Sequence, residues 1–348
     1  TIGCRPGSVL LASAREAGCV AADNYHFARG FRLVPWARDL KNLRRCLRDA
    51  PPDLLHVNGS QDHWAVAMAN RQLGRPVCLL RTRHNTYPVK NSNVNRILNR
   101  KWTDYQIVVC DSVRRTLSQQ PIFDHARMCS IHNGVDAERF RPDDDARRGI
   151  RAQLGFQPND LVCGIAARLV DAKGHVFLFK AAAQLINTYP GLKIAVLGQG
   201  VLEENLRRLA NDLGIGEQVS FLGFRDNMEQ CVQAFDIGVQ PSIDCDTSSF
   251  SLKEQMAAGK PVVASDHGGL KEIVSDGVEG YVVTAGEVNP LAAALRRLLD
   301  SEELRNRMGE AGRKRVLRDF TLEVFAERTL RAYRRAMGIH RDSGGRYR

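Results

Sequence analysis

One stretch indicates the fold class most directly: Leu161-Val-Cys-Gly-Ile-Ala-Ala-Arg-Leu-Val-Asp-Ala-Lys-Gly174. Apolar and small residues fill positions 161–167, which is typical of a buried strand, and polar residues begin at Arg168. A helical pattern then runs from residue 174 to residue 188. A strand, a short polar loop and a helix in this order form the repeating unit of a parallel, doubly wound sheet.

The same unit recurs on both sides of this stretch. In the first half of the chain we expect helices such as 37–49 between four strands, at residues 53–57, 76–81, 105–110 and 127–132. In the second half we expect helices at 174–188, 201–213 and 291–300 and strands at residues 161–167, 192–197, 219–222, 237–240, 261–264 and 280–283. The alternation predicts an α/β protein with two Rossmann-like, doubly wound domains that face a cleft.

The domain division is expected near residue 145, where prolines, glycine and a run of aspartates interrupt the pattern. We predict an N-terminal domain at residues 1–145 and a C-terminal domain at residues 146–320. A helix at residues 321–337 is expected to pack back on the first domain, and residues 338–348 are expected to form a flexible tail. A chain of 348 residues is long enough for two cores.

The composition indicates a soluble protein with a basic surface. No apolar run approaches the roughly 18–20 residues of a membrane span. The nine cysteines are scattered without a Cys-x-x-Cys pair, which predicts reduced thiols in a cytoplasmic protein and no metal site. The formal charge of +11 favours anionic partners, although an ordinary basic surface explains it equally well. Nucleic acid is not expected, since aromatic residues make up only 7% and no nucleic-acid-binding motif occurs.

Arg168 and Lys173 flank the polar loop of the opening stretch. Ligands of doubly wound sheets bind at the carboxyl ends of the strands, so both cations should face the crevice. Two cations beside the first amides of a helix would clamp a diphosphate. Taken alone, the segment fits a solvated surface loop just as well.

A Gly-x-Gly pair, Gly198 and Gly200, leads from the strand at 192–197 into the next helix. Such glycines let the backbone approach a phosphate, but the third position of a dinucleotide fingerprint is Glu203 here. No acidic residue ends the next strand to hold an adenosine ribose, which argues against an oxidoreductase that binds NAD or FAD. A tight turn remains the commoner explanation of an isolated Gly-x-Gly.

The segment 241–261 places two carboxylates around a predicted helix start near Phe250. Asp246 lies in the preceding loop and Glu254 lies in the first turn, with seven residues between them. Free amides at residues 249–252 would favour an anionic diphosphate, while the carboxylates would bind sugar hydroxyls. A capping box from Ser251 to Glu254 explains the same residues, and taken alone it explains them better.

A basic segment follows the first-domain strand at 76–81. It offers His84 together with Arg81, Arg83 and Lys90, ahead of a helix expected at 95–102. The histidine could bind a sugar or assist proton movement, and the cations could attract an anionic acceptor. Most histidines and cations in loops are merely solvated.

Taken together, these segments resemble the family-4 retaining glycosyltransferases of the GT-B type. The resemblance covers about residues 53–333 and rests on the order and spacing of several short motifs. These are Arg168…Lys173-Gly174, Leu197-Gly-Gln-Gly200, Phe221-Leu-Gly223, Ala234-Phe-Asp-Ile-Gly-Val-Gln-Pro-Ser242, Met256-Ala-Ala-Gly-Lys-Pro-Val-Val-Ala264, Gly268-Gly-Leu-Lys-Glu-Ile-Val274 and Ile131-His-Asn-Gly-Val-Asp136.

The resemblance implies roles for particular residues. Arg168 and Lys173 would bind the donor diphosphate and stabilise the departing nucleotide, and Glu254 would hold the ribose hydroxyls. The amides of Phe250, Ser251 and Leu252 would contact phosphate or donor sugar, and His84 would lie near the transferred sugar. Family members usually need no metal or other cofactor, because cationic side chains neutralise the leaving group.

Three features depart from the family pattern. The first of the paired carboxylates is usually glutamate, whereas here it is Asp246, and residues 247–249 replace a glycine-containing stretch. The chain also begins at a segment that a strand, a Gly-rich loop and a helix normally precede. We expect that this unit is omitted from the sequence, because its loss would expose the edge of the strand at 53–57.

The expected activity is transfer of a sugar, with retention, from a UDP- or GDP-type donor to a glycan or glycolipid acceptor. The acceptor would belong to a bacterial-type envelope polysaccharide or lipopolysaccharide. The protein would be cytoplasmic, with peripheral contact to an anionic membrane surface. A non-catalytic or shortened nucleotide-sugar-binding protein is the alternative, and a Rossmann oxidoreductase is a weaker one.

Overall fold

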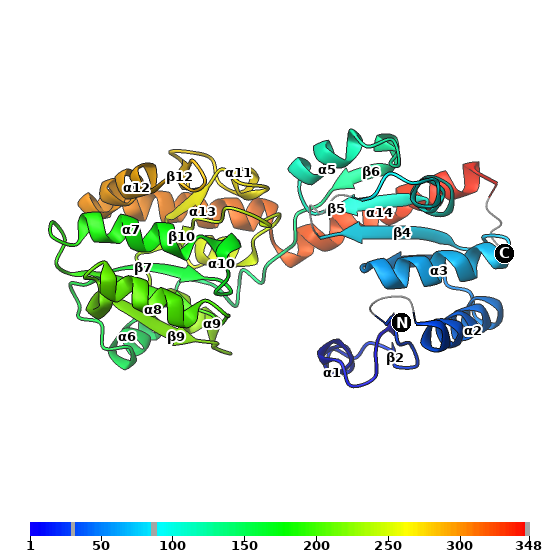
Figure 1. Ribbon diagram of the computed structural model, residues 1–348, viewed down its shortest axis with the longest axis horizontal. Coiled ribbons are helices and arrows are strands. Elements are labelled where there is room, and N and C mark those ends of the chain that lie inside the picture. Colours follow the sequence, from blue (N-terminus) through cyan, green and yellow to red (C-terminus); the bar gives the residue numbers. More distant parts are fainter. Residues whose placement is uncertain (29–31, 85–88, 345–348) are drawn as a thin grey trace. The chain divides into compact units, whose positions relative to one another are not determined.

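The computed structural model describes residues 1–28, 32–84 and 89–344, and its chain divides into two compact units (Figure 1). Unit 1 comprises Thr1–Val109, Arg114–Ile131 and Arg328–Arg348, and unit 2 comprises Cys110–Val113 and His132–Glu327. Each unit contains a parallel sheet with helices packed against it, so the expected pair of Rossmann-like α/β domains is confirmed.

Unit 2 is built on a six-stranded parallel sheet in the order β12-β11-β10-β7-β8-β9. The strands are β7 (Leu161–Ala166), β8 (Leu192–Leu197), β9 (Val219–Gly223), β10 (Ile237–Gln240), β11 (Val262–Ser265) and β12 (Gly280–Val283). The chain builds outward from β7 in one direction and from β10 in the other, so the strand order reverses between these two neighbours. This is the topological switch point at which doubly wound sheets bind ligands.

Helices cover both faces of this sheet (Figure 1), as expected for strands that are apolar on both sides. One face packs against helices α7 (His175–Leu185), α8 (Glu203–Asp212) and α12 (Val288–Asp300). The other packs against α6 (Asp144–Gln153), α9 (Met228–Gln233), α10 (Phe250–Ala257), α11 (Leu270–Ile273) and α13 (Glu302–Asp319). Cys163 and Ile165 face the first group, and Val162 faces the second.

Unit 1 contains a four-stranded parallel sheet in the order β3-β4-β5-β6 and a separate two-stranded sheet. The larger sheet consists of β3 (Leu54–Val57), β4 (Cys78–Arg83), β5 (Tyr105–Val108) and β6 (Met128–Ser130), and the smaller one of β1 (Ile2–Gly3) and β2 (Ala21–Ala22). Its helical segments include α1 (Val9–Glu16), α2 (Leu33–Asp49), α3 (Ser60–Gln72), α4 (Asn93–Ile97), the π-helical turn η1 (Leu98–Trp102) and most of α5 (Asp111–Ser118). Leucines of α2 and alanines of α3 form its core with Val57 and Leu79.

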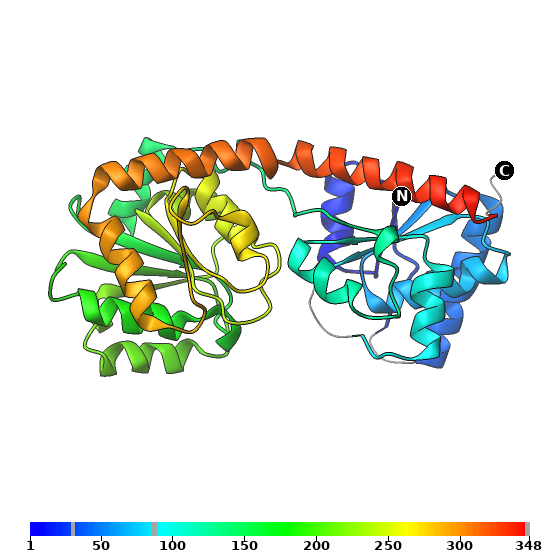
Figure 2. The same ribbon diagram turned by 90° about the horizontal axis from the view of Figure 1, so that it is seen from above.

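The last helix, α14 (Leu322–Asp342), begins in unit 2 and ends in unit 1 (Figure 2). Within unit 1, Tyr333 Oη lies 2.7 Å from Nδ1 of His56, and Nδ1 of His340 lies 3.1 Å from a carboxylate oxygen of Asp104. Both His340 and Asp104 are fully buried. The expectation of a flexible tail from residue 338 is therefore wrong up to residue 342, since the helix continues and its end is anchored in unit 1.

Residues 132–145, which the sequence analysis assigned to the first domain, pack in unit 2. The amide of Val135 donates to the carbonyl of Phe320 at 2.8 Å, and Val135 forms a parallel bridge with Thr321.

Among the described residues, no helix is both long enough and apolar enough to cross a membrane.

Candidate functional site

Two loops of unit 2 meet at the topological switch point. One follows β7 and carries Arg168 and Lys173, and the other follows β10 and carries Asp246. The amide of Ile243 donates to the carbonyl of Ala172 at 2.9 Å, which joins the loops directly. The structure thus brings together, on one edge of one sheet, residues that lie about 70 positions apart in the sequence.

Lys173, which is partly buried, and Asp246, which is buried, form an ion pair where the two loops meet. Lys173 Nζ donates to Oδ2 of Asp246 at 2.8 Å, and the same oxygen accepts from Ser242 Oγ at 2.8 Å and from Gln240 Nε2 at 3.0 Å. Asp246 is only 4% exposed. Its other oxygen makes no hydrogen bond within the described part of the chain. Lys173 therefore holds Asp246 in place, and its expected role at a diphosphate stays a prediction.

Arg168 lies just beyond the carboxyl end of β7 and is exposed. Its guanidinium makes no hydrogen bond or ion pair with any residue that the structure describes. In contrast to Lys173, it offers a charge that no carboxylate neutralises. This is the arrangement that an anionic ligand at the switch point needs.

Helix α10 begins at Phe250, as the sequence predicted, but its cap differs from the expected one. The N-cap is Ser249, whose Oγ accepts from the amide of Leu252 at 3.2 Å. Ser251 already lies inside the helix, where its Oγ accepts from Gln255 Nε2 at 2.9 Å. A capping box from Ser251 to Glu254 is therefore absent, and Glu254 does not close the first turn.

Glu254 is half-buried on α10 and has no hydrogen-bond partner among the described residues. Burial raises the pKa of Glu254 to about 7, and the positive charges of Arg139 and Lys253 offset this only in part. A carboxyl group that costs free energy to bury, yet is not hydrogen-bonded within the protein, is suited to accept bonds from ligand hydroxyls.

Gly198 and Gly200 have a structural explanation in the packing of two loops. A Cβ at Gly198 would lie 2.1 Å from the carbonyl oxygen of Ala167, and one at Gly200 would lie 2.3 Å from that of Leu169. The φ of Gly198 is +131°, which other residues rarely adopt. The loop after β8 must thus approach the loop after β7 closely, and a role for these glycines at a phosphate stays a prediction.

Gly268 and Gly269 have a structural role that was not predicted from the sequence. Their Cβ atoms would lie 2.2 Å from the carbonyl oxygen of Asp246 and 1.8 Å from that of Thr247, respectively. The amide of Gly269 also donates to the carbonyl of Asp246 at 3.0 Å. These two glycines form a backbone support for the loop that carries Asp246, and the adjacent pair before a short helix was the available signal.

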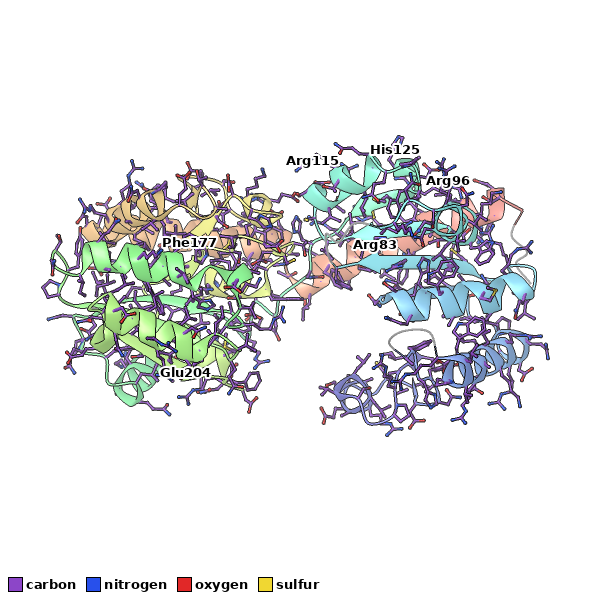
Figure 3. The ribbon with its side chains drawn as sticks, viewed as in Figure 1. Arg83, Arg96, Arg115, His125, Phe177 and Glu204 are labelled. Carbon is purple, nitrogen blue, oxygen red and sulfur yellow. The ribbon has the colours of Figure 1, made fainter. Side chains whose placement is uncertain are left out.

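Arg81 and Arg83 do not form a basic loop, and that expectation is wrong. Both lie on β4 and are buried (Figure 3 labels Arg83), because their partners come from helix α3, strand β5 and the turn η1. The side chain of Arg81 contacts Nδ1 of His63 at 2.5 Å and Ser60 Oγ at 3.2 Å. Arg83 donates to Gln106 and Asn99, each at 2.8 Å.

His84 follows β4 and reaches the surface of unit 1, where its Nε2 lies 3.0 Å from Oδ1 of Asn58. Partial burial of the ring, together with the charge of Arg81, lowers the pKa of His84 and favours the neutral imidazole. Lys90 is exposed, and residues 85–88 between them lie outside the described residues. The roles expected of His84 and Lys90 stay predictions.

All nine cysteines are free thiols, and Cys19 and Cys46 are exposed. Among the described residues, one group could hold a metal ion: Cys78, Asp104 and His340 in unit 1. Asp104 is also bound by Arg75 Nη2 at 2.5 Å and by the amide of Leu79 at 2.8 Å. The contacts of Asp104 with His340, Arg75 and Leu79 anchor the end of α14 within unit 1.

Two family models match consecutive parts of the chain. "Glycosyltransferase Family 4" matches residues 6–139, and "Glycosyl transferases group 1" matches residues 146–315. The chain belongs to the group 1, family-4 glycosyltransferases. The correspondence of Asp246 and Glu254 to the paired carboxylates of this family stays a prediction.

Curated relatives carry related names. The chain is 33% identical over 224 residues to the GDP-mannose-dependent monoacylated alpha-(1-6)-phosphatidylinositol monomannoside mannosyltransferase of Corynebacterium glutamicum. This alignment covers 62% of this chain and 57% of that protein. It is 34% identical over 245 residues to the D-inositol 3-phosphate glycosyltransferase of Mycobacterium marinum, and this alignment covers 68% of this chain and 51% of that protein. The chain thus spans little more than half the length of these relatives.

Solved glycosyltransferase structures share the fold. A glycosyltransferase from Rickettsia africae matches with a TM-score of 0.85 at 17% identity, covering 95% of this chain and 88% of that one. Alr3699/HepE of Anabaena, in complex with UDP, matches with a TM-score of 0.82 at 21% identity, covering 95% and 90%. At these identities the likeness concerns the fold alone.

Proposed function

We propose that this chain is a retaining glycosyltransferase that binds a nucleoside diphosphate sugar in unit 2 and needs no metal. The observation that carries the proposal is what the joined loops after β7 and β10 and the first turn of α10 present. Among the described residues, these segments carry an unpaired guanidinium, a lysine–aspartate ion pair, a helix start and a half-buried carboxyl without a hydrogen bond. Each is suited to a different part of one ligand, and no other part of unit 2 combines them among the described residues.

The parts of such a donor can be assigned to particular groups. Arg168 would bind the diphosphate and stabilise the charge that develops on the departing nucleotide, while the amides of Phe250, Ser251 and Leu252 would contact phosphate or sugar. Glu254 would accept bonds from the ribose hydroxyls, and the free oxygen of Asp246 would bind a hydroxyl of the transferred sugar. Since Asp246 is shorter than glutamate, the neighbouring loop determines how closely it approaches that sugar.

The comparisons support a nucleoside diphosphate without fixing its base. One relative is named as dependent on GDP-mannose, and one similar structure contains UDP. We propose a UDP- or GDP-sugar as donor and a glycan or glycolipid as acceptor, in the synthesis of an envelope polymer. The glycolipid proposal is supported by the phosphatidylinositol monomannoside in the name of the Corynebacterium relative.

A basic depression of unit 1 supports contact with an anionic surface. It measures about 660 Å³ and is lined by Arg96, Arg100, Lys101 and Arg127 together with Asp124 (Arg96 is labelled in Figure 3). These cations replace Arg81 and Arg83 as the charges that could attract an anionic acceptor or the head groups of a membrane. We place the protein in the cytoplasm, with peripheral membrane contact through this depression.

A nucleotide-binding screen tests the proposal. We expect UDP-glucose or GDP-mannose to raise the melting temperature of the wild-type protein and Arg168→Ala to abolish that shift. Arg208→Ala, which changes an exposed arginine on α8, serves as the matched control and should leave the shift unchanged. A wild-type protein that no nucleotide sugar stabilises, or an Arg168→Ala variant that still responds fully, would contradict the proposed donor site.

A further inference from the structure

Lys253 is a fully buried lysine on α10, and none of the donor contacts proposed above involves its side chain. Its Nζ donates to the carbonyl oxygen of Asn133 at 2.5 Å and to Oγ of Ser248 at 3.0 Å, and both acceptors are neutral. No carboxylate oxygen of the described residues lies within 4.0 Å of this nitrogen. Burying an ammonium group without a counter-ion costs the folded protein free energy. The presence of a lysine at this position therefore needs an explanation.

The charged and aromatic groups around Lys253 come from several elements. Glu254 on the same helix and Asp246 in the preceding loop are the carboxylates whose negative charge it experiences. The rings of Phe250 and Phe320 lie 5.4 and 5.5 Å from its Nζ. Burial lowers the pKa of Lys253 to about 7, since the two carboxylates offset the lost hydration only in part.

Ser248 connects Lys253 to the loop and to a histidine. Its Oγ accepts from Lys253 and from the amide of Asn133 at 3.1 Å, and it lies 3.4 Å from Nδ1 of His132. A hydroxyl has one proton and two acceptor positions, so Ser248 must donate to Nδ1. His132 then carries its proton on Nε2, which lies 3.2 Å from Oε2 of Glu272.

This chain of hydrogen bonds fixes the residue directly before the cap of α10. Because Ser248 is adjacent to Ser249, the side chain of Lys253 holds the loop from which the helix amides emerge. Lys253 therefore supports the loop on which the donor diphosphate would rest. It is a positioning residue, since it contacts the site through Ser248.

We propose that the donor diphosphate supplies the counter-charge that Lys253 lacks, so that binding a nucleotide sugar makes Lys253 take up a proton from solvent. The inference rests on the proposed function and adds a proton-linked step to donor binding. At pH 8 the free protein would hold Lys253 mostly neutral, and the bound protein would hold it charged. Uptake should approach one proton per donor at pH 8 and be small at pH 6. The affinity should fall by up to about tenfold for each pH unit above 7.

Titration calorimetry at pH 8 in two buffers of different ionisation enthalpy measures this uptake. UDP-glucose and GDP-mannose are suitable probes, because neither has a phosphate group that titrates near neutrality. The binding heat of the wild-type protein should differ between the buffers by nearly the full difference of their ionisation enthalpies. Lys253→Met removes the titrating group at similar volume and should make the heat independent of the buffer.

Two further variants keep the test decisive. Lys260→Met changes another lysine of unit 2 whose pKa burial lowers to about 7, and it should leave the proton uptake intact. Lys253→Arg retains a charge that does not titrate, so it should bind the donor without proton uptake and without the loss of affinity above pH 7. If Lys253→Met fails to fold, this variant alone decides the point.

The outcomes separate this inference from the proposed function. Donor binding whose heat does not depend on the buffer overturns the inference and leaves the proposed function standing. Proton uptake that persists in Lys253→Met or Lys253→Arg also overturns it, because a group other than Lys253 then takes up the proton. A wild-type protein that binds neither nucleotide sugar overturns the proposed function and the inference together.

Discussion

Glu254→Gln should make the free protein more stable at pH 8 while it weakens the binding of a nucleotide sugar. The substitution preserves the shape of the side chain and removes its charge. In the wild-type protein, burial raises the pKa of this carboxyl from its ordinary value of 4.5 to about 7. Above pH 7 the folded protein must therefore hold a half-buried, ionised group that has no hydrogen-bond partner among the described residues.

The size and the pH range of the effect follow from the two pKa values. Between pH 4.5 and pH 7 the folded state binds more protons at Glu254 than the unfolded state does, so stability falls as the pH rises. The loss is complete above about pH 7 and absent below about pH 4.5. Its upper limit is about 3 kcal/mol, and since solvent reaches the carboxyl we expect about 1–3 kcal/mol.

Urea unfolding of wild type and Glu254→Gln at a series of pH values from 5 to 8 provides the measurement. The difference in the free energy of unfolding should be small at pH 5 and grow in favour of the variant toward pH 8. Glu204→Gln, at an exposed position on α8 (labelled in Figure 3), is the matched control and should show no such trend. A variant that is less stable than wild type at pH 8, or a difference that is constant with pH, would show that burial of the ionised Glu254 does not destabilise the free protein.

Two other predictions concern the loop support and the basic depression. Gly269→Ala should destabilise the protein by about 3 kcal/mol or more and abolish nucleotide binding, because its Cβ would lie 1.8 Å from the carbonyl oxygen of Thr247. Gly277→Ala, where φ is +77° and no atom lies within 4 Å, should cost only about 1–2 kcal/mol in the same urea assay and leave binding intact. The wild-type protein should float with phosphatidylglycerol vesicles at low salt, and the triple variant Arg96→Glu, Arg100→Glu and Lys101→Glu should not. Equal flotation of both proteins, or of neither, would contradict a role for the depression.

The strands of unit 2 could be predicted because their signal is local. A central parallel strand is buried on both faces, so its sequence is an apolar run that ends where the sheet ends. Positions 161–167 and 192–197 were placed correctly to within one residue for this reason. The helix between Glu302 and Asp319 was not predicted, since 18 residues with few buried side chains give only a weak apolar period.

The burial of Arg81 and Arg83 could not be predicted, because their partners are distant in the sequence. Gln106 and Asn99 lie 23 and 16 positions from Arg83, and His63 lies 18 positions from Arg81. A charged residue in a strand is expected at the surface unless polar groups from other elements surround it. Only the packing of α3, β5 and η1 around β4 shows that such groups are present.

The cap of α10 shows how a small error in a local prediction can conceal a site. A capping box at Ser251 assigns Glu254 a structural partner and leaves nothing unexplained, whereas a cap at Ser249 leaves its carboxyl half-buried and without a hydrogen bond. With Ser249 as cap, the third residue of the helix is Leu252, which has no carboxyl to complete a box. The neighbouring Lys253 is likewise buried without a counter-ion. Two adjacent residues that each weaken the free protein, on a helix beside the switch point, are explained most simply by a ligand that compensates for both.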